Sequence, residues 1–191
     1  MIKYILKNIA KLFAKIYLAY LKPAIDDYVI NIQKEKFKYF GKEVLLKGGG
    51  AIYHPENISI GDYVHIGDNY FMMGIGGIDI GMGTIISRNS CLHSGNHDFK
   101  KFEFLPYNDN YDKRKIIIGK GVWIGQNVNI LPGISIGDGA IIGMGVTVSK
   151  DVSKGEIIVG TSNRSIGFRD QEALNKLLDD ELFITKFNPK I

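Results

Sequence analysis

The chain carries a six-residue repeat of aliphatic positions that runs from Ile60 to Val152. A helix needs apolar spacings of three and four, and a long strand needs strict alternation, so neither element explains the repeat. A period of six predicts a very short strand followed by a turn, with one large aliphatic side chain per hexad directed into a narrow core. The repeated positions form three runs: Ile60, Ile66, Met72; Ile80, Ile86, Leu92; and Ile118, Ile124, Ile130, Ile136, Ile142, Val148.

Three hexads of this kind close one triangular coil, so the twelve positions predict four coils. The stretch from Val44 to Asn57 supplies a partial fifth coil. Each coil pairs its backbone with the next, which is why no single repeat would be stable alone. Glycine directly follows many of the repeated aliphatic residues, and tight corners or a close approach of the next coil would both require it.

Two insertions interrupt the repeat. Two extra residues fall in the glycine-rich corner at 74–77, and twenty extra residues separate Leu92 from Ile118, near 98–115. A narrow prism cannot bury the longer insertion, and long loops of compact domains are usually functional or disordered. Five aromatic residues in the insertion favour a packed arm that projects from the prism. Its aromatic residues are Phe99, Phe102, Phe104, Tyr107 and Tyr111.

Helical patterns flank the repeat on both sides. An N-terminal amphipathic pattern ends at Pro23, a second helix is predicted from about Asp26 to Phe40, and a third from Arg169 to Phe183. We therefore divide this mainly β chain into three parts. They are an N-terminal helical segment at 1–43, a β-helix at 44–160 with the loop insertion 98–115, and a C-terminal tail with a short helix at 161–191.

The first helix has two interpretations. Lys3, Lys7, Lys11 and Lys15 form one polar stripe, and nearly all other positions are apolar. In the first, the helix covers the open end of the prism or packs against partner subunits. In the second, it contacts an anionic membrane surface through residues 1–22. Its longest uncharged run is too short for a membrane span, and lysines interrupt any signal-peptide core.

Composition limits the remaining possibilities. A length of 191 residues and a hydrophobic fraction of 45% suit one domain with appendages. Five lysines precede the first acid, Asp26, and exceed the whole net charge of +4, so the prism is nearly neutral and nothing in it indicates nucleic acid. Cys91 is the single cysteine, which fits a reducing cytoplasm; we interpret it as a small coil residue rather than a nucleophile.

The segment from His93 to Asp98 concentrates two of the four histidines where the prism meets the inserted loop. Histidine titrates near neutrality and can take a proton from an alcohol while a new bond forms. Asp98 is positioned in the sequence to orient the ring of His97 or to hold its charge. The alternative is that a histidine in a turn serves only the structure of the loop.

From Ser94 to Arg164 the chain resembles the maltose, galactoside and nodulation-type sugar O-acetyltransferases, and its His-Asp pair resembles the branch that acetylates capsular and exopolysaccharide sugars. The resemblance implies a left-handed parallel β-helix of four to five coils, a homotrimer, and His97 as the general base. The motifs that carry it are Gly121 to Gly125, Leu131 to Gly133, Ile136 to Asp138, Ile142 to Gly145, Ser149 to Asp151 and Gly160 to Arg164.

The same resemblance assigns expected roles to further residues. Trp123 would wall the site near the pantetheine arm of acetyl-CoA, and Lys150 and Arg164 would meet the phosphates. Gln126, Met144 and Ser149 would line the coenzyme groove, or they are simply corner positions of the repeat. The acceptor side would include His93, Met73 and Tyr107.

Two departures limit what the resemblance transfers. Ser162 stands where the family usually has proline, which would loosen the adenine end of the groove. Met73 stands where galactoside-type enzymes have an asparagine that helps to hold the acceptor sugar. The identity of the acceptor is therefore not transferred.

The expected function is acetyl-CoA-dependent O-acetylation of a sugar or polysaccharide-precursor hydroxyl, in the cytoplasm or peripherally at the inner face of the membrane. One alternative is an N-acyltransferase on an amino sugar or antibiotic, and another is a catalytically inactive hexapeptide-repeat binding scaffold. A zinc enzyme of the γ-carbonic anhydrase type shares the prism, but the four histidines do not reproduce its spacing, so no metal is expected.

Overall fold

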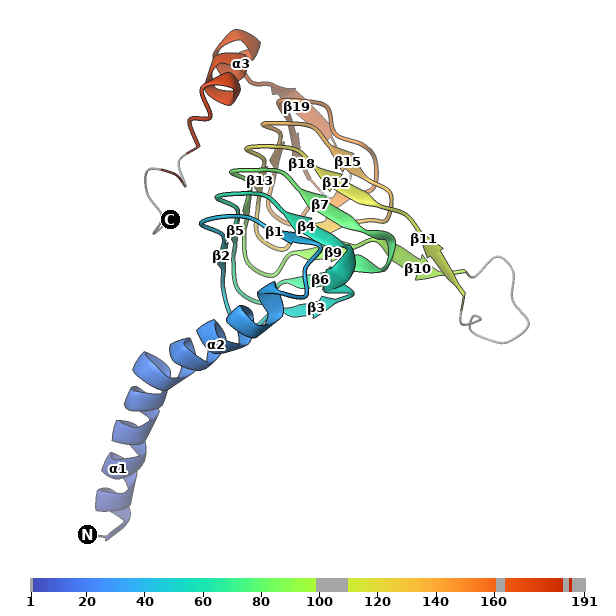
Figure 1. Cartoon of the computed structure of the whole chain (residues 1–191). Coiled ribbons are helices and arrows are strands. Elements are labelled where there is room, and N and C mark those ends of the chain that lie inside the picture. Colours follow the sequence, from blue (N-terminus) through green and yellow to red (C-terminus); the bar gives the residue numbers. More distant parts are fainter. Residues whose placement is uncertain (1, 99–109, 161–163, 184–185, 187–191) are drawn as a thin grey trace.

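The computed structural model describes residues 2–98, 110–160, 164–183 and 186 (Figure 1). The chain forms a triangular parallel β-helix, from which a long N-terminal helix, a hairpin and a short C-terminal helix extend. The mainly β architecture predicted from the hexad repeat is thus confirmed.

The prism has three faces, each a sheet of short strands stacked in parallel. The first sheet contains β1 (Tyr39–Phe40), β4 (Ile58–Ile60), β7 (Ile78–Ile80), β12 (Ile116–Ile118) and β15 (Ser135–Ile136). The second sheet contains β2 (Leu45–Leu46), β5 (His65–Ile66), β8 (Ile85–Ile86), β13 (Trp123–Ile124), β16 (Ile141–Ile142), β18 (Glu156–Val159) and β19 (Arg164–Phe168), of which β19 runs antiparallel to β18. The third sheet contains β3 (Ala51–Tyr53), β6 (Phe71–Met73), β9 (Cys91–His93), β14 (Asn129–Ile130) and β17 (Thr147–Val148).

The repeated aliphatic residues stack on one another along the core. On the second sheet, Ile66 pairs with Ile86, Ile86 with Ile124, and Ile124 with Ile142. Each of these four side chains is at most 1% exposed. Burying one such side chain contributes about 1.5–3 kcal/mol, so this column stabilises the stacking of neighbouring coils.

The number of coils is close to the prediction. The stretch from Val44 to Asn57 supplies β2 and β3, as expected, and β1 completes this first coil by pairing with β4. The prism therefore begins at Tyr39, inside the range assigned to the N-terminal helical segment. At the other end it continues past the last hexad, because Val152 bridges to Ile136 and β18 pairs with β16.

The glycines that follow the aliphatic residues are explained by close approach. A Cβ atom at Gly61 would lie 2.7 Å from the backbone nitrogen of Met82 in the next coil, and one at Gly125 would lie 2.7 Å from that of Met144. The left-handed corner positions fall two residues later. Asn69, Asn89 and Asn127 occupy one such corner with φ of 56°, 58° and 58°, a conformation that asparagine tolerates better than most residues.

The N-terminal helix is continuous and does not end at Pro23. It consists of α1 (Ile2–Ile16), a π-helical turn η1 (Tyr17–Leu21) and α2 (Lys22–Lys34). Pro23 lies in the first turn of α2, directly after the π-helical turn. A π-turn bonds residues five apart and removes part of the regular hydrogen-bond ladder, so the missing N–H of proline is tolerated there.

The second predicted helix ends earlier than expected. Helix α2 stops at Lys34, and Tyr39–Phe40 form β1 instead of a last helical turn. Phe37 is buried and its ring lies 5.3 Å from that of Phe40, so both rings cover the open end of the prism. This tertiary packing and the pairing of Tyr39 with Ser59 override the local helical pattern.

The long helix does not cover the open end of the prism. It points away from the β-helix (Figure 1), and every described side chain from Lys3 to Ile32 is exposed. The expectation that it closes the prism is therefore wrong, because Phe37 and Phe40 already do so. Packing against a partner subunit and contact with a membrane are the interpretations that remain.

The remaining elements lie at the corners and the C-terminal end. Helix α3 begins after Asp170, whose carboxylate accepts a hydrogen bond of 3.0 Å from the N–H of Ala173. This confirms the third predicted helix, with shorter ends. The elements at the corners and at the C-terminal end are η2 (Pro55–Asn57), η3 (Gly74–Gly76), β10 (Gly95–His97), β11 (Tyr111–Lys113) and α3 (Gln171–Asp179).

Candidate active site

The inserted loop begins as a two-stranded hairpin. Strands β10 and β11 pair antiparallel, with His97 opposite Tyr111, and project from the prism (Figure 1). The predicted arm is confirmed for this base. Residues 99–109 lie outside the described residues, and with them lie Phe99, Phe102, Phe104 and the expected acceptor residue Tyr107.

Ser94 anchors the hairpin to the preceding coil. Its side chain is fully buried; the hydroxyl donates to the carbonyl of Met73 at 2.6 Å and accepts from the N–H of Gly76 at 2.9 Å. Its own carbonyl accepts from the N–H of Arg114 at 2.9 Å. The serine thus joins both hairpin strands to the glycine-rich corner, so the two-residue insertion there serves the arm.

Gly76 makes this anchoring possible, and its replacement tests it. A Cβ atom at Gly76 would collide with the carbonyl oxygen of Ser94 and would lie 2.7 Å from the nitrogen of Arg114. We expect Gly76→Ala to displace the hairpin. With His97 as the general base that the resemblance implies, turnover should fall by about 10²-fold, since small misplacements of catalytic groups have effects of this size. The dissociation constant of acetyl-CoA and the thermal midpoint of the same variant should stay close to the wild-type values. Equal losses of binding and turnover would contradict this account.

His97 occupies a defined position as the last residue of β10, two residues beyond the pair nearest the prism. The side chain is half-buried, and its ring centroid lies 4.3 Å from that of Tyr111 at an angle of 36°. The N–H of His97 donates to Oδ1 of Asn96 at 3.0 Å, and the N–H of Asp98 donates to the carbonyl of Asn110 at 2.9 Å. A strand pair rather than a free loop therefore sets the direction of the imidazole.

The other two expected acceptor residues lie beside the hairpin root. Met73 and His93 are register partners on neighbouring strands of the third sheet. The ring of His93 stacks on Phe71 at 5.9 Å, and Phe71 contacts Tyr53 at 5.5 Å. Tyr53 and Phe71 were not among the expected site residues, although the hexad register places them on the same outer face.

A groove on the second sheet brings together three residues expected to bind the coenzyme. Trp123 is 52% exposed and Met144 is 70% exposed, and both line a groove of about 600 Å³ together with Gln126. Lys47 and Arg88 also line it, and Nη2 of Arg88 lies 3.1 Å from Oδ2 of Asp68. The groove therefore offers an apolar wall with cationic groups beside it.

Arg88 is a groove residue that the sequence analysis missed, and the repeat itself contained the signal. Asp68, Arg88, Gln126 and Met144 each stand two places after an inward aliphatic residue, at the corner between the second and third sheets. Equivalent corner positions of a β-helix lie above one another. All four of these corner residues could therefore have been predicted from the position of Gln126.

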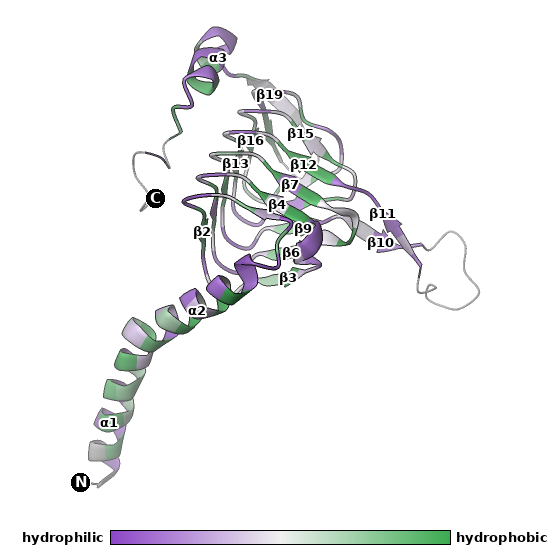
Figure 2. Cartoon of the chain, in the orientation of Figure 1, coloured by the Kyte–Doolittle hydropathy of each residue, from purple (hydrophilic) through white to green (hydrophobic). Residues whose placement is uncertain are grey.

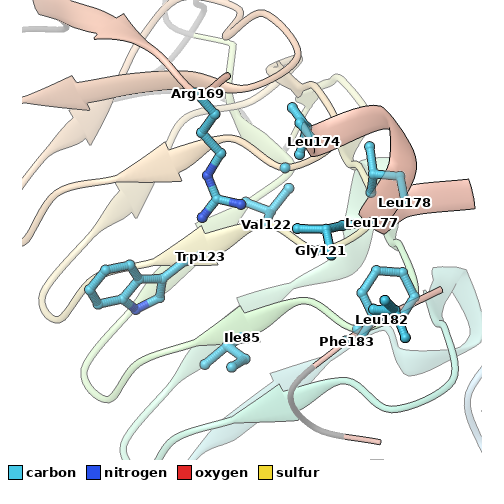
Figure 3. Close-up of a pocket in the computed structure, with 12 residues that line it drawn as sticks. Ile85, Gly121, Val122, Trp123, Arg169, Leu174, Leu177, Leu178, Leu182 and Phe183 are labelled. Carbon is cyan, nitrogen blue, oxygen red and sulfur yellow. The ribbon is translucent and has the colours of Figure 1, made fainter. Parts of the chain in front are cut away.

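A second pocket lies on the other side of Trp123. It encloses about 270 Å³ between α3 and the second sheet. In Figure 3, the side chain of Arg169 extends from the end of β19 toward Val122 and Trp123, and leucines of α3 form the opposite wall. Arg169 is thus a cationic neighbour of Trp123 that the sequence motifs did not indicate. The leucines are Leu174, Leu177, Leu178 and, beyond the helix, Leu182.

The remaining expected site residues do not join this groove within one chain. Ser149 and Lys150 follow β17, at the corner between the third and first sheets from which the His97 hairpin also departs. The backbone of Arg164 begins β19 opposite Val159, and Ser162 lies outside the described residues. One chain therefore separates the expected residues into a hairpin group and a Trp123 group.

Two further observations concern other chemistry. Among the residues that the structure describes, no three histidine, cysteine, aspartate or glutamate side chains gather as a metal site. Cys91 is half-buried, and burial raises the pKa of its thiol, which makes the nucleophilic thiolate less accessible. This agrees with its interpretation as a coil residue.

The prism is similar to known proteins in sequence and in fold. Residues 115–150 match the model of the bacterial transferase hexapeptide (six repeats). The matched residues include β12 to β17 of the prism. A protein of Escherichia coli (strain K12) named "Putative colanic acid biosynthesis acetyltransferase WcaF" is 31% identical over 63% of this chain, and the match spans 63% of that relative's length.

Solved hexapeptide-repeat structures give the same picture. A maltose O-acetyltransferase from Clostridium difficile 630 is 25% identical, with a TM-score of 0.66 over 74% of either chain. A point mutant of AntD, an N-acyltransferase from Bacillus cereus in complex with dTDP-4-amino-4,6-dideoxyglucose and Coenzyme A, is 25% identical with a TM-score of 0.65, over 81% of this chain and 95% of its own. The resemblance to hexapeptide-repeat sugar acyltransferases predicted from the motifs is confirmed.

Proposed function

We propose that this protein is an acetyl-CoA-dependent O-acetyltransferase that acts on a sugar or polysaccharide-precursor hydroxyl. The observation that carries the proposal is the groove in which Trp123 and Met144 remain exposed beside Lys47 and Arg88. An apolar wall with neighbouring cations suits a ligand that has both a pantetheine chain and phosphates. The names of the similar proteins, a colanic acid biosynthesis acetyltransferase and a maltose O-acetyltransferase, support the same reaction.

The proposed reaction is a direct transfer. His97 removes the proton of the acceptor hydroxyl, and the oxygen attacks the thioester carbonyl of acetyl-CoA. Backbone N–H groups near the hairpin stabilise the oxyanion, a contribution of about 3–4 kcal/mol for each donor. The tetrahedral intermediate then breaks its C–S bond, and the proton held by His97 passes to the leaving thiolate. The products are the acetyl ester and free coenzyme A, and Asp98 orients the imidazole.

The separation of the two residue groups supports a site shared between copies. The hairpin with His97 leaves the corner between the third and first sheets, whereas Trp123, Gln126 and Met144 line the second sheet and its corner with the third. In the proposed homotrimer, the hairpin of one copy reaches the groove of the next. This assembly needs no metal.

Transfer to an amino group is a second candidate, because the N-acyltransferase AntD is as similar to this chain as the maltose O-acetyltransferase is. Both reactions need a base and a coenzyme groove, so those features do not separate them. An acceptor panel of matched hydroxyl and amino sugars distinguishes the two. We propose a cytoplasmic location for either reaction, where a single cysteine stays reduced.

Calorimetric titration with acetyl-CoA tests the proposal. We expect saturable binding of about one coenzyme per chain, weakened about tenfold or more by Trp123→Ala, because a large aromatic contact surface is lost. Ile117→Ala removes another exposed apolar side chain, on the first sheet, and serves as the matched control. Absence of binding at millimolar ligand would contradict the proposal and favour a binding scaffold without catalysis.

A further inference from the structure

The long N-terminal helix presents an apolar surface that nothing in the described part of the chain covers. Leu6, Leu12 and Phe13 are 59%, 59% and 71% exposed. Figure 2 shows hydrophobic residues along α1 and into the first half of α2, on a rod that points away from the prism. At about 1.5 Å per residue, residues 2–34 form a rod of roughly 50 Å. Among the described residues, no helix is both long and apolar enough to cross a bilayer.

The charged and apolar residues of α1 lie on opposite sides of the helix. Successive residues advance by about 100°, so the four lysines at intervals of four residues fall within a sector about 120° wide. The large aliphatic residues and Phe13 fall in a second sector of about the same width, centred opposite to the first, whereas Tyr4 falls within the lysine sector. The lysines are Lys3, Lys7, Lys11 and Lys15, and the described residues of the apolar sector are Leu6, Ile9, Leu12, Phe13 and Ile16.

The π-helical turn keeps this apolar side continuous into α2. Because η1 takes up about one extra residue in a turn, everything after it is set back by roughly 100°. With this setback, Ile25, Tyr28 and Ile32 fall in the apolar sector of α1. In an uninterrupted α-helix, Asp27 would instead occupy the centre of that sector. The irregular turn therefore joins two helices into one amphipathic surface.

The charge of the helix selects the partner. Residues 2–34 carry six lysines and two aspartates, whereas the rest of the chain sets 18 basic residues against 18 acidic ones. We propose that the helix formed by residues 2–34 lies in the plane of an anionic membrane surface. Its apolar side enters the boundary between headgroups and acyl chains, and the lysines, carried on long flexible stems, bend toward the lipid phosphates.

This docking would hold the prism at the membrane without a transmembrane segment. It stands independently of the acetyl-transfer proposal, because no groove or hairpin residue takes part in it. Self-association of the helix is the competing explanation for an exposed apolar side. Apolar contacts between copies would bury that side but would not require four lysines on the opposite face, and the lysine stripe therefore favours lipid.

Vesicle flotation of the full-length protein tests the proposal. We expect the protein to float with vesicles of phosphatidylcholine in which about one lipid in three is the anionic phosphatidylglycerol. With vesicles of phosphatidylcholine alone, it should stay at the bottom of the gradient. The variant Lys3→Gln, Lys7→Gln, Lys11→Gln, Lys15→Gln should bind about 10²–10³-fold more weakly, because each lysine near an anionic surface adds attraction. Leu12→Ser with Phe13→Ser should also lose flotation, through the apolar side.

The matched control changes four exposed lysines elsewhere: Lys36→Gln, Lys38→Gln, Lys42→Gln and Lys120→Gln. This variant has the same net charge as the stripe variant and should float as the wild type does. Circular dichroism and the thermal midpoint should be unchanged in all variants, since the rod does not cover the prism. The proposal is overturned if the wild type fails to float, or if the stripe variant floats as well as the control. The proposal is also overturned, in favour of self-association, if Leu12→Ser with Phe13→Ser lowers the molar mass measured by light scattering but leaves flotation unchanged.

Discussion

The His97→Ala variant is expected to lose about 10²–10⁴-fold in turnover, because a positioned general base contributes this much to the transfer of a proton. In the proposed mechanism His97 acts on the acceptor hydroxyl and does not form the wall of the coenzyme groove, so the dissociation constant of acetyl-CoA should stay within about twofold. Steady-state kinetics with a saturating acceptor and calorimetry with acetyl-CoA measure the two quantities separately. The split between them distinguishes a lost base from a lost binding site.

A second histidine provides the control for this experiment. His54 is exposed, lies at a corner with φ of 55°, and pairs with Glu56 at 3.1 Å, far in sequence from the hairpin. His54→Asn keeps a residue that tolerates the left-handed conformation and should leave turnover unchanged. If His97→Ala retains turnover near that of His54→Asn, His97 is not the base, and the hairpin has only a structural part.

The repeat made most of the prism predictable. One inward aliphatic residue per six positions fixes strand length, face and register at once, since a change of register would expose residues such as Ile86 and Ile124. The same reasoning placed a projecting arm at the insertion after Leu92, although it did not predict that the arm begins as a hairpin. It did not place the end of the second helix, because the residues after Lys34 keep a helical pattern while Phe37 and Phe40 gain more by packing on the core.

The candidate site was predictable only where motifs repeat the geometry of the prism. Trp123, Gln126 and Met144 meet because they occupy neighbouring positions of stacked coils, which hexad counting reveals. Arg169 lines the same pocket as Trp123 because β19 returns antiparallel to β18 and α3 lies beside the second sheet. No periodic pattern encodes this arrangement. The separation of His97 from the groove likewise depends on the corner from which the hairpin departs.

Mixing two inactive variants is expected to restore activity, and this is the sharpest test of a site shared between copies. One chain carries His97→Ala and keeps the groove. The other carries Gln126→Glu and Met144→Glu, which place two carboxylates where phosphates of the coenzyme would bind, at corner positions outside the core. In a trimer whose sites form between neighbours, a hairpin of the second kind meets an intact groove of the first kind.

The expected size of the recovery follows from the symmetry of the ring. Co-expression with two different affinity tags and purification through both yields only mixed trimers, and in every such trimer about one site in three combines His97 with an unaltered groove. Turnover per trimer should therefore return to about a third of the wild-type value, although either variant alone is nearly inactive. Sites contained within single chains would give no recovery, because each chain then lacks either the base or the groove. A mixed trimer of the correct mass that stays inactive would thus refute the shared site. The role of His97 as the base would then be tested only by the kinetics of the His97→Ala variant.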